Sequence, residues 1–170
     1  MAESNTNVRL LSVDVRSAKF GFVVFEGPDT LLDFGVRSYT RQCGPINATA
    51  GRSFLRLVDL HAPSLIVLRV APSRLDKRTR RAKIAARALR QISKRRSIPL
   101  RCLSRGTIKK FFRSQGLTTK HRIASFLAER FPDLAWKLPP QRRLWQPERH
   151  RMSVFDAAAA GVAFIDRLSA

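Results

Sequence analysis

The chain is poor in acidic residues and cysteines, and it has no long apolar run. Only 12 Asp and Glu stand against 33 Lys and Arg. The two isolated cysteines, Cys43 and Cys102, do not form the spacing of a zinc site or a disulfide framework. We therefore expect them to be reduced and the protein to be cytoplasmic. No apolar stretch reaches the roughly 18 residues of a membrane span, and the polar start Met1–Asn5 is not typical of a signal peptide, so no membrane partner is expected.

The imbalance of charge is the feature that most limits the function. A net charge of +21 is typical of surfaces that bind phosphate backbones or acidic membranes. The length of 170 residues and the apolar fraction of 44% suit one globular domain with a sizeable core. We expect residues 1–7 to form a disordered tail and residues 8–170 to form a single domain.

Apolar patterning predicts a meander of strands followed by alternating helices and strands. The expected strands of the meander are Val8–Val15, Phe20–Phe25 and Leu31–Tyr39, separated by short turns. The continuous apolar run Leu65–Leu68 is typical of a strand buried on both faces of a parallel sheet. The other expected segments are a loop Arg41–Thr49, a helix Arg52–His61 with Phe54, Leu55 and Val58 on its inner side, a helix Asp76–Arg96, a strand Leu100–Leu103, helices Thr107–Ser114 and Thr119–Phe131, a loop Leu138–Arg151 and a helix Ser153–Leu168. This order indicates an α/β fold with a five-stranded mixed sheet, antiparallel in strands one to three and then parallel, flanked by helices.

A single-sign basic block occupies the middle of the chain. Between Arg74 and Arg113 there are sixteen Lys or Arg and one acid, Asp76. Like charges one helical turn apart repel, so an unrelieved positive helix face favours a polyanion partner over simple solvation. Phosphate contacts of this kind give affinity without sequence choice. The residues that we expect to contact nucleic acid are Lys83, Arg87, Arg90 and Lys94 on one helix face, together with Lys109, Lys110 and Lys120.

Two tryptophans have two interpretations. Trp136 and Trp145 lie near further arginines and could stack on bases, as aromatic side chains do in single-strand-binding proteins. The alternative is simple packing, which the sequence favours for both.

Two aspartates are the candidate catalytic residues. Asp14 lies within an apolar strand, where a carboxylate is costly unless it is paired. Asp156 opens a helix of small apolar residues that permit close approach to the sheet, so the two carboxylates could converge and hold a metal ion. Each also has a structural explanation. Asp14 could bond to turn amides, and Ser153–Asp156 has the spacing of a capping box with Ser153 as N-cap.

The order of these segments resembles the RuvC-type Holliday-junction resolvases, within the ribonuclease-H-like superfamily. The matching segments are Leu11–Ser17 with Asp14, Gly21–Val24, Pro63–Arg69, Ile108–Lys110 with Gly116, Lys120 and Ile123, and Asp156–Ala158. The resemblance implies a ribonuclease-H-like fold and a homodimer. It also implies phosphodiester hydrolysis with two Mg²⁺ (or Mn²⁺) ions held by carboxylates, here Asp14 and Asp156 as metal ligands and catalytic residues.

The chain departs from the family at the expected acids. The strand that ends in a catalytic Glu in the family ends here in Arg69, and the second acid of the final helix is Ala159. Val15-Arg16 stands where the family has Pro-Gly. Two of four expected carboxylates therefore remain, with Asp76, Glu148 and His150 as conceivable replacements. An inward Arg69 would repel a metal ion, pair with an aspartate or hold a phosphate directly.

The sequence thus predicts a nucleic-acid-binding RuvC-like protein, nucleoid-associated and acting as a structure-selective endonuclease on branched DNA. One alternative is a catalytically degenerate DNA- or RNA-binding protein on the same fold. Another is an RNA-processing nuclease of the ribonuclease-H-like type, such as the YqgF-like group.

Overall fold

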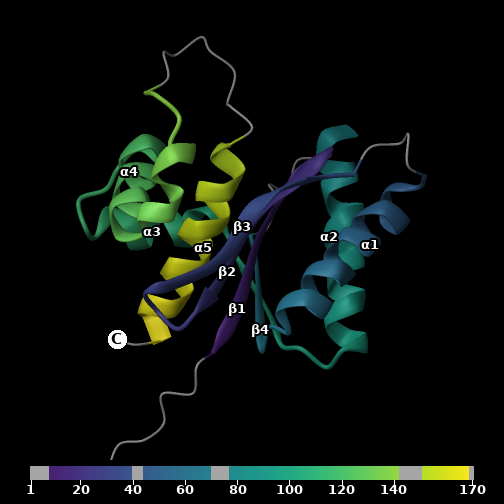
Figure 1. The fold of residues 1–170 in the computed structure, drawn as a ribbon. Helices are drawn as coiled ribbons and strands as arrows, with labels where there is room; N and C mark the ends of the chain where they lie inside the picture. Colours follow the sequence, from purple (N-terminus) through teal and green to yellow (C-terminus); the bar gives the residue numbers. More distant parts are fainter. Residues whose placement is uncertain (1–7, 40–43, 70–76, 142–150, 169–170) are drawn as a thin grey trace, which may run out of the picture.

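Five strands form one mixed sheet, with strand order β3-β2-β1-β4-β5 (Figure 1). The computed structural model describes residues 8–39, 44–69, 77–141 and 151–168. The antiparallel meander and the parallel pairing of the later strands are confirmed. The strands are β1 (Arg9–Val15), β2 (Lys19–Glu26), β3 (Thr30–Ser38), β4 (Leu65–Arg69) and β5 (Leu100–Leu103).

Helices cover both faces of the sheet (Figure 1). One face carries α1 (Ile46–His61) and α2 (Lys77–Arg95). The other carries α3 (Arg105–Arg113), α4 (Lys120–Arg130), the 3-10 helix η2 (Pro132–Lys137) and α5 (Met152–Leu168). Among the described residues, no helix combines the length and apolar content that crossing a membrane requires.

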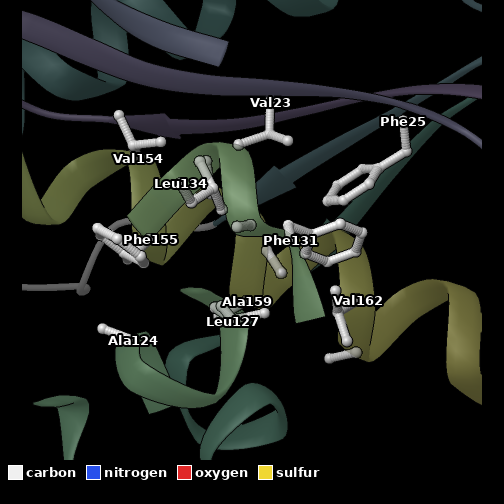
Figure 2. Packing of buried hydrophobic residues seen from close by; sticks show 14 of the residues in the cluster. Val23, Phe25, Ala124, Leu127, Phe131, Leu134, Val154, Phe155, Ala159 and Val162 are labelled. Carbon is white, nitrogen blue, oxygen red and sulfur yellow. The ribbon is translucent and has the colours of Figure 1, made fainter. Parts of the chain in front are cut away.

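Strand β1 supplies side chains to both layers because successive residues of a strand point to opposite faces. Leu11 and Val13 belong to the hydrophobic cluster under α1 and α2. Leu10 belongs to the cluster under α5, and Ser12, two residues on, donates a hydrogen bond to the carbonyl oxygen of Ala157 in α5 at 2.6 Å. Asp14 continues the α5-facing series. Figure 2 shows the packing on this side, including Phe25 of β2.

Two glycines allow α5 to lie unusually close to the sheet. A Cβ at Gly21 of β2 would overlap the backbone carbonyl of Ser153, and a Cβ at Gly161 of α5 would overlap the ring of Phe25. The N-terminal turns of α5 are therefore held against β1 and β2. This is the close approach that the small residues of the helix predict.

Helix α1 begins earlier than its sequence predicts. It starts at Ile46 instead of Arg52, because Thr49 and Ala50 are buried and the Thr49 hydroxyl donates to the carbonyl of Pro45 at 2.7 Å. The predicted loop Arg41–Thr49 is wrong over its last four residues, 46–49. The inner side of the helix includes Leu57, while Leu55 is exposed. The short helix η2 is not predicted by the pattern either.

Candidate functional site

The end of β1 places an acid and an arginine side by side. Asp14 of β1 is the register partner of Arg69 on the parallel neighbour β4, so both side chains emerge on the face that α5 covers. Arg69 Nη1 lies 2.7 Å from Asp14 Oδ1. The Asp14 side chain is 4% exposed and that of Arg69 is 14% exposed, so this is a largely buried ion pair.

Asp156 joins this pair from the second turn of α5. Its Oδ2 lies 3.2 Å from the same nitrogen, Arg69 Nη1, which is 2.7 Å from Asp14 Oδ1. The sum of these two distances, 5.9 Å, is the largest separation that the two carboxylate oxygens can have. The predicted convergence of the two aspartates is therefore observed, while their role as metal ligands stays a prediction.

The capping-box interpretation of Asp156 is wrong. Helix α5 begins at Met152, so Ser153 lies inside the helix and is not its N-cap. The acid is held by side chains from other elements instead. The Asp156 carboxylate therefore makes ion pairs with distant side chains, although its sequence spacing fits a helix cap.

Two further cations complete what we call the ion-pair cluster: Asp14, Arg16, Arg69, Lys120 and Asp156. Arg16 bridges the aspartates, with Nε 2.9 Å from Asp14 Oδ2 and Nη2 2.5 Å from Asp156 Oδ2. Lys120 Nζ lies 3.4 Å from the same oxygen of Asp156. Three cations face two carboxylates, so the cluster carries a net charge of +1.

Arg16 is the site residue that the sequence does not identify. It follows β1 directly, at the turn where the resembling family has Gly. In the sequence, Arg16 is a cation two residues after a buried acid. That spacing indicates a role in the site only once Asp156 is known to lie close to Asp14.

The charges of the cluster hold Arg69 in its ionised form. Burial lowers the pKa of Arg69, but the neighbouring Asp14 and Asp156 raise it by more, against an opposing contribution from Arg16. The net effect is a pKa above the usual value of arginine. Arg69 is therefore positively charged at neutral pH.

The residues present do not fit a two-metal centre. Mg²⁺ takes about six oxygen ligands in octahedral geometry, whereas three of the four carboxylate oxygens here already pair with cationic nitrogens. Among the described residues, no group of three His, Cys, Asp or Glu could hold a metal ion. Ala159 lies in the hydrophobic cluster with Leu127 (Figure 2). The replacement ligands considered from sequence, Asp76, Glu148 and His150, lie outside the described residues.

Arg69 borders a cavity on each side of the cluster. One cavity, of about 40 Å³, is bounded by Arg69 and Asp156 and by the cations Arg105, Lys109 and Lys120. The other, of about 180 Å³, lies towards α2. Its lining residues are Val15, Leu68, Arg69, Ala82, Lys83, Ala86, Arg87 and Arg90. Basic residues thus flank the paired aspartates in two directions.

Six of the eight predicted nucleic-acid-binding residues are exposed. The basic face of α2 is exposed at all four predicted positions, while Ala82, Ala85 and Leu89 are buried against the sheet. Lys109 and Lys110 are exposed on α3, whereas Lys120 and Arg69 belong to the ion-pair cluster. Their contact with nucleic acid stays a prediction.

Trp136 packs at the surface of the protein and not in the core. Its side chain is 67% exposed, with its ring centroid 6.5 Å from that of Phe34 and 4.9 Å from Lys137 Nζ. Trp145 lies outside the described residues. Trp136 therefore keeps a ring surface that a ligand can reach.

Comparison with known proteins identifies the fold. No protein-family model and no curated protein sequence matches the chain. Thermus thermophilus RuvC, in complex with a Holliday junction substrate, is 15% identical with a TM-score of 0.68, over 95% of this chain and 96% of that chain. The yeast mitochondrial Holliday junction resolvase Ydc2 is 12% identical with a TM-score of 0.61, over 94% and 79% of the two chains. The Fowlpox virus resolvase, in complex with substrate Holliday junction DNA, is 11% identical with a TM-score of 0.50, over 93% and 99%. The chain therefore has the RuvC-type ribonuclease-H-like fold.

Proposed function

We propose that this protein binds branched nucleic acid on a RuvC-type fold and does not cut it. The observation that carries the proposal is the ion-pair cluster, in which Arg16 and Arg69 occupy the carboxylates of Asp14 and Asp156. A metal ion would have to displace both guanidinium groups from largely buried positions. The likeness to resolvases that are in complex with junction DNA favours a branched ligand over plain duplex.

The charge of the site supports binding as strongly as it opposes catalysis. A cluster with a net positive charge attracts a phosphodiester without an intervening metal ion. Exposed cations of α2 and α3 continue this attraction on either side of the cluster. Affinity from such contacts depends on salt and not on base sequence.

One observation favours the competing function, a Mg²⁺- or Mn²⁺-dependent endonuclease. The two aspartate oxygens lie no more than 5.9 Å apart, the sum of their 2.7 and 3.2 Å distances to Arg69 Nη1, which is within the span of a metal centre. The two functions differ in what the acids do. In a nuclease they would coordinate metal, and in a binding protein they hold arginines in place.

Cleavage assays with a four-way junction separate these functions. We expect the wild-type protein to bind the junction and leave it intact in Mg²⁺ or Mn²⁺, because the carboxylates are already paired. Gel analysis of the labelled strands after incubation measures this, with plain duplex and an RNA–DNA hybrid as comparison substrates. Metal-dependent cutting that disappears in both Asp14→Asn and Asp156→Asn would refute the proposal and assign the site to catalysis.

The basic face of α2 has its own test. Arg87→Glu combined with Arg90→Glu is expected to weaken binding to all sequences alike. The affinity of the variant should also depend less on salt. The slope of the logarithm of the binding constant against the logarithm of the salt concentration should become shallower by about 0.9 for each phosphate that the variant no longer neutralises. Fluorescence anisotropy titrations at several salt concentrations measure both effects.

A matched control carries the same change of net charge elsewhere. Arg56→Glu with Arg167→Glu alters exposed residues of α1 and of the last turn of α5. We expect this control to retain most of the affinity. An equal loss of affinity in both double variants would mean that total charge, and not the α2 face, determines binding.

A further inference from the structure

The cavity between α2 and the ends of β1 and β4 has an apolar floor and a cationic rim. Val15, Leu68 and two alanines of α2 form the floor. The charged lining residues among those described are four cations, Arg69, Lys83, Arg87 and Arg90, and no carboxylate. Like charges gathered around one cavity repel one another, so an anion placed there lowers the energy of the arrangement.

Arg69 is held in place before any ligand arrives. Both of its ion pairs use Nη1, which leaves Nε and Nη2 outside these two contacts. Asp14 and Asp156 fix the side chain, which is only 14% exposed, so little side-chain freedom remains to be given up on binding. The planar guanidinium offers paired donors that match the oxygens of a phosphate.

From this arrangement we infer that the cavity is a binding site for one backbone phosphodiester, held by Arg69 from the sheet and by Lys83 and Arg87 from α2. The inference rests on the proposed function and names the ligand of that surface. The described residues of the rim include no carboxylate, so the phosphate supplies the negative charge that these cations lack.

The position of Arg69 also defines a path for the strand. The same residue lines the second cavity, where Arg105, Lys109 and Lys120 lie. A strand whose phosphate sits against Arg69 therefore passes over the ion-pair cluster and reaches the cations of α3 and α4 with its next phosphates. The paired aspartates lie beneath it.

A double-substitution cycle between protein and ligand tests the site. The probe is a labelled four-way junction in which one phosphate at a time, around the branch point, is replaced by an uncharged methylphosphonate. Dissociation constants are measured by fluorescence anisotropy for the wild type, Arg87→Gln and Lys83→Gln. Both substituted residues are exposed and lie outside the ion-pair cluster, so the fold and the cluster stay intact.

At one position the methylphosphonate should weaken wild-type binding by about 10- to 100-fold, the range for one hydrogen bond between charged groups. The same replacement should weaken binding by Arg87→Gln and Lys83→Gln clearly less, because each of these variants already lacks a positive charge at that phosphate. Arg56→Gln, an exposed residue of α1, is the matched control and should show the full wild-type effect at that position.

The possible failures are distinguishable. In one, the wild type binds the junction, but every methylphosphonate weakens binding of Arg87→Gln and Lys83→Gln as much as it weakens binding of the wild type. This result overturns the phosphate site and leaves the proposed function standing. Absence of wild-type binding to the unmodified junction overturns both.

Discussion

Asp14→Asn is expected to lower the free energy of unfolding by about 3–5 kcal/mol, because it leaves Arg69 buried without its closest counter-charge. The sign of this change is diagnostic. In a cluster of metal-binding acids, neutralising one carboxylate removes repulsion between like charges and stabilises the protein that is free of metal. In the ion-pair cluster the carboxylate is the attractive partner. Urea unfolding followed by circular dichroism, in the presence of a chelator, measures the difference.

Two further variants make this experiment specific. Asp14→Asn combined with Arg69→Gln removes both partners, and its cost should be less than the sum of the two single costs. Asp59→Asn breaks the exposed pair with Arg96, whose side chains are about half exposed, and should change stability by about 1 kcal/mol or less. An Asp14→Asn protein as stable as the wild type would contradict the ion-pair cluster.

Gly21→Ala should destabilise the protein by about 3 kcal/mol or more, at or beyond the upper end of overpacking costs. The added methyl group meets the backbone carbonyl of Ser153, and backbone cannot rotate away as a side chain can. Relief requires α5 to move off the sheet. That movement would draw Asp156 away from Arg69 and break the hydrogen bond between Ser12 and Ala157.

The matched control is Gly51→Ala in α1. Nothing lies within 4 Å of a Cβ at Gly51, and the residue is within a helix. The substitution should therefore raise stability by about 0.4–1 kcal/mol. Thermal unfolding of both variants measures the contrast. Equal stability of Gly21→Ala and wild type would mean that α5 is not held against β2 as described.

Much of the fold could be predicted because its strands follow simple periods. The continuous apolar run of β4 predicts a parallel strand buried on both faces, and the small residues of α5 predict its close approach to the sheet. The small residues of α5 also predict that Asp14 and Asp156 converge. The start of α1 could not be predicted in this way, since Ala50 becomes part of the core only in a cluster with residues of distant strands.

The pairing within the site could not be predicted for a similar reason. It depends on β1 and β4 being neighbours in the sheet and on Arg69 lying in register with Asp14. No short turn connects these two strands, so their register cannot be predicted from a local turn. The departure from the family at Arg69 is visible in the sequence, but the sequence leaves open whether this arginine repels a metal, binds an acid or binds a phosphate. Arg16 stands out in the sequence only as a cation two residues after a buried acid, and its role emerges once the second aspartate is placed beside the first.

The double hold on each aspartate has a consequence for redesign of the site. An acid placed at position 69 alone would leave Arg16 among three carboxylates, which would retain its guanidinium more strongly instead of admitting Mg²⁺. Changing Arg16 alone would leave Arg69 against both acids. A metal centre built at this site therefore requires replacement of both arginines together.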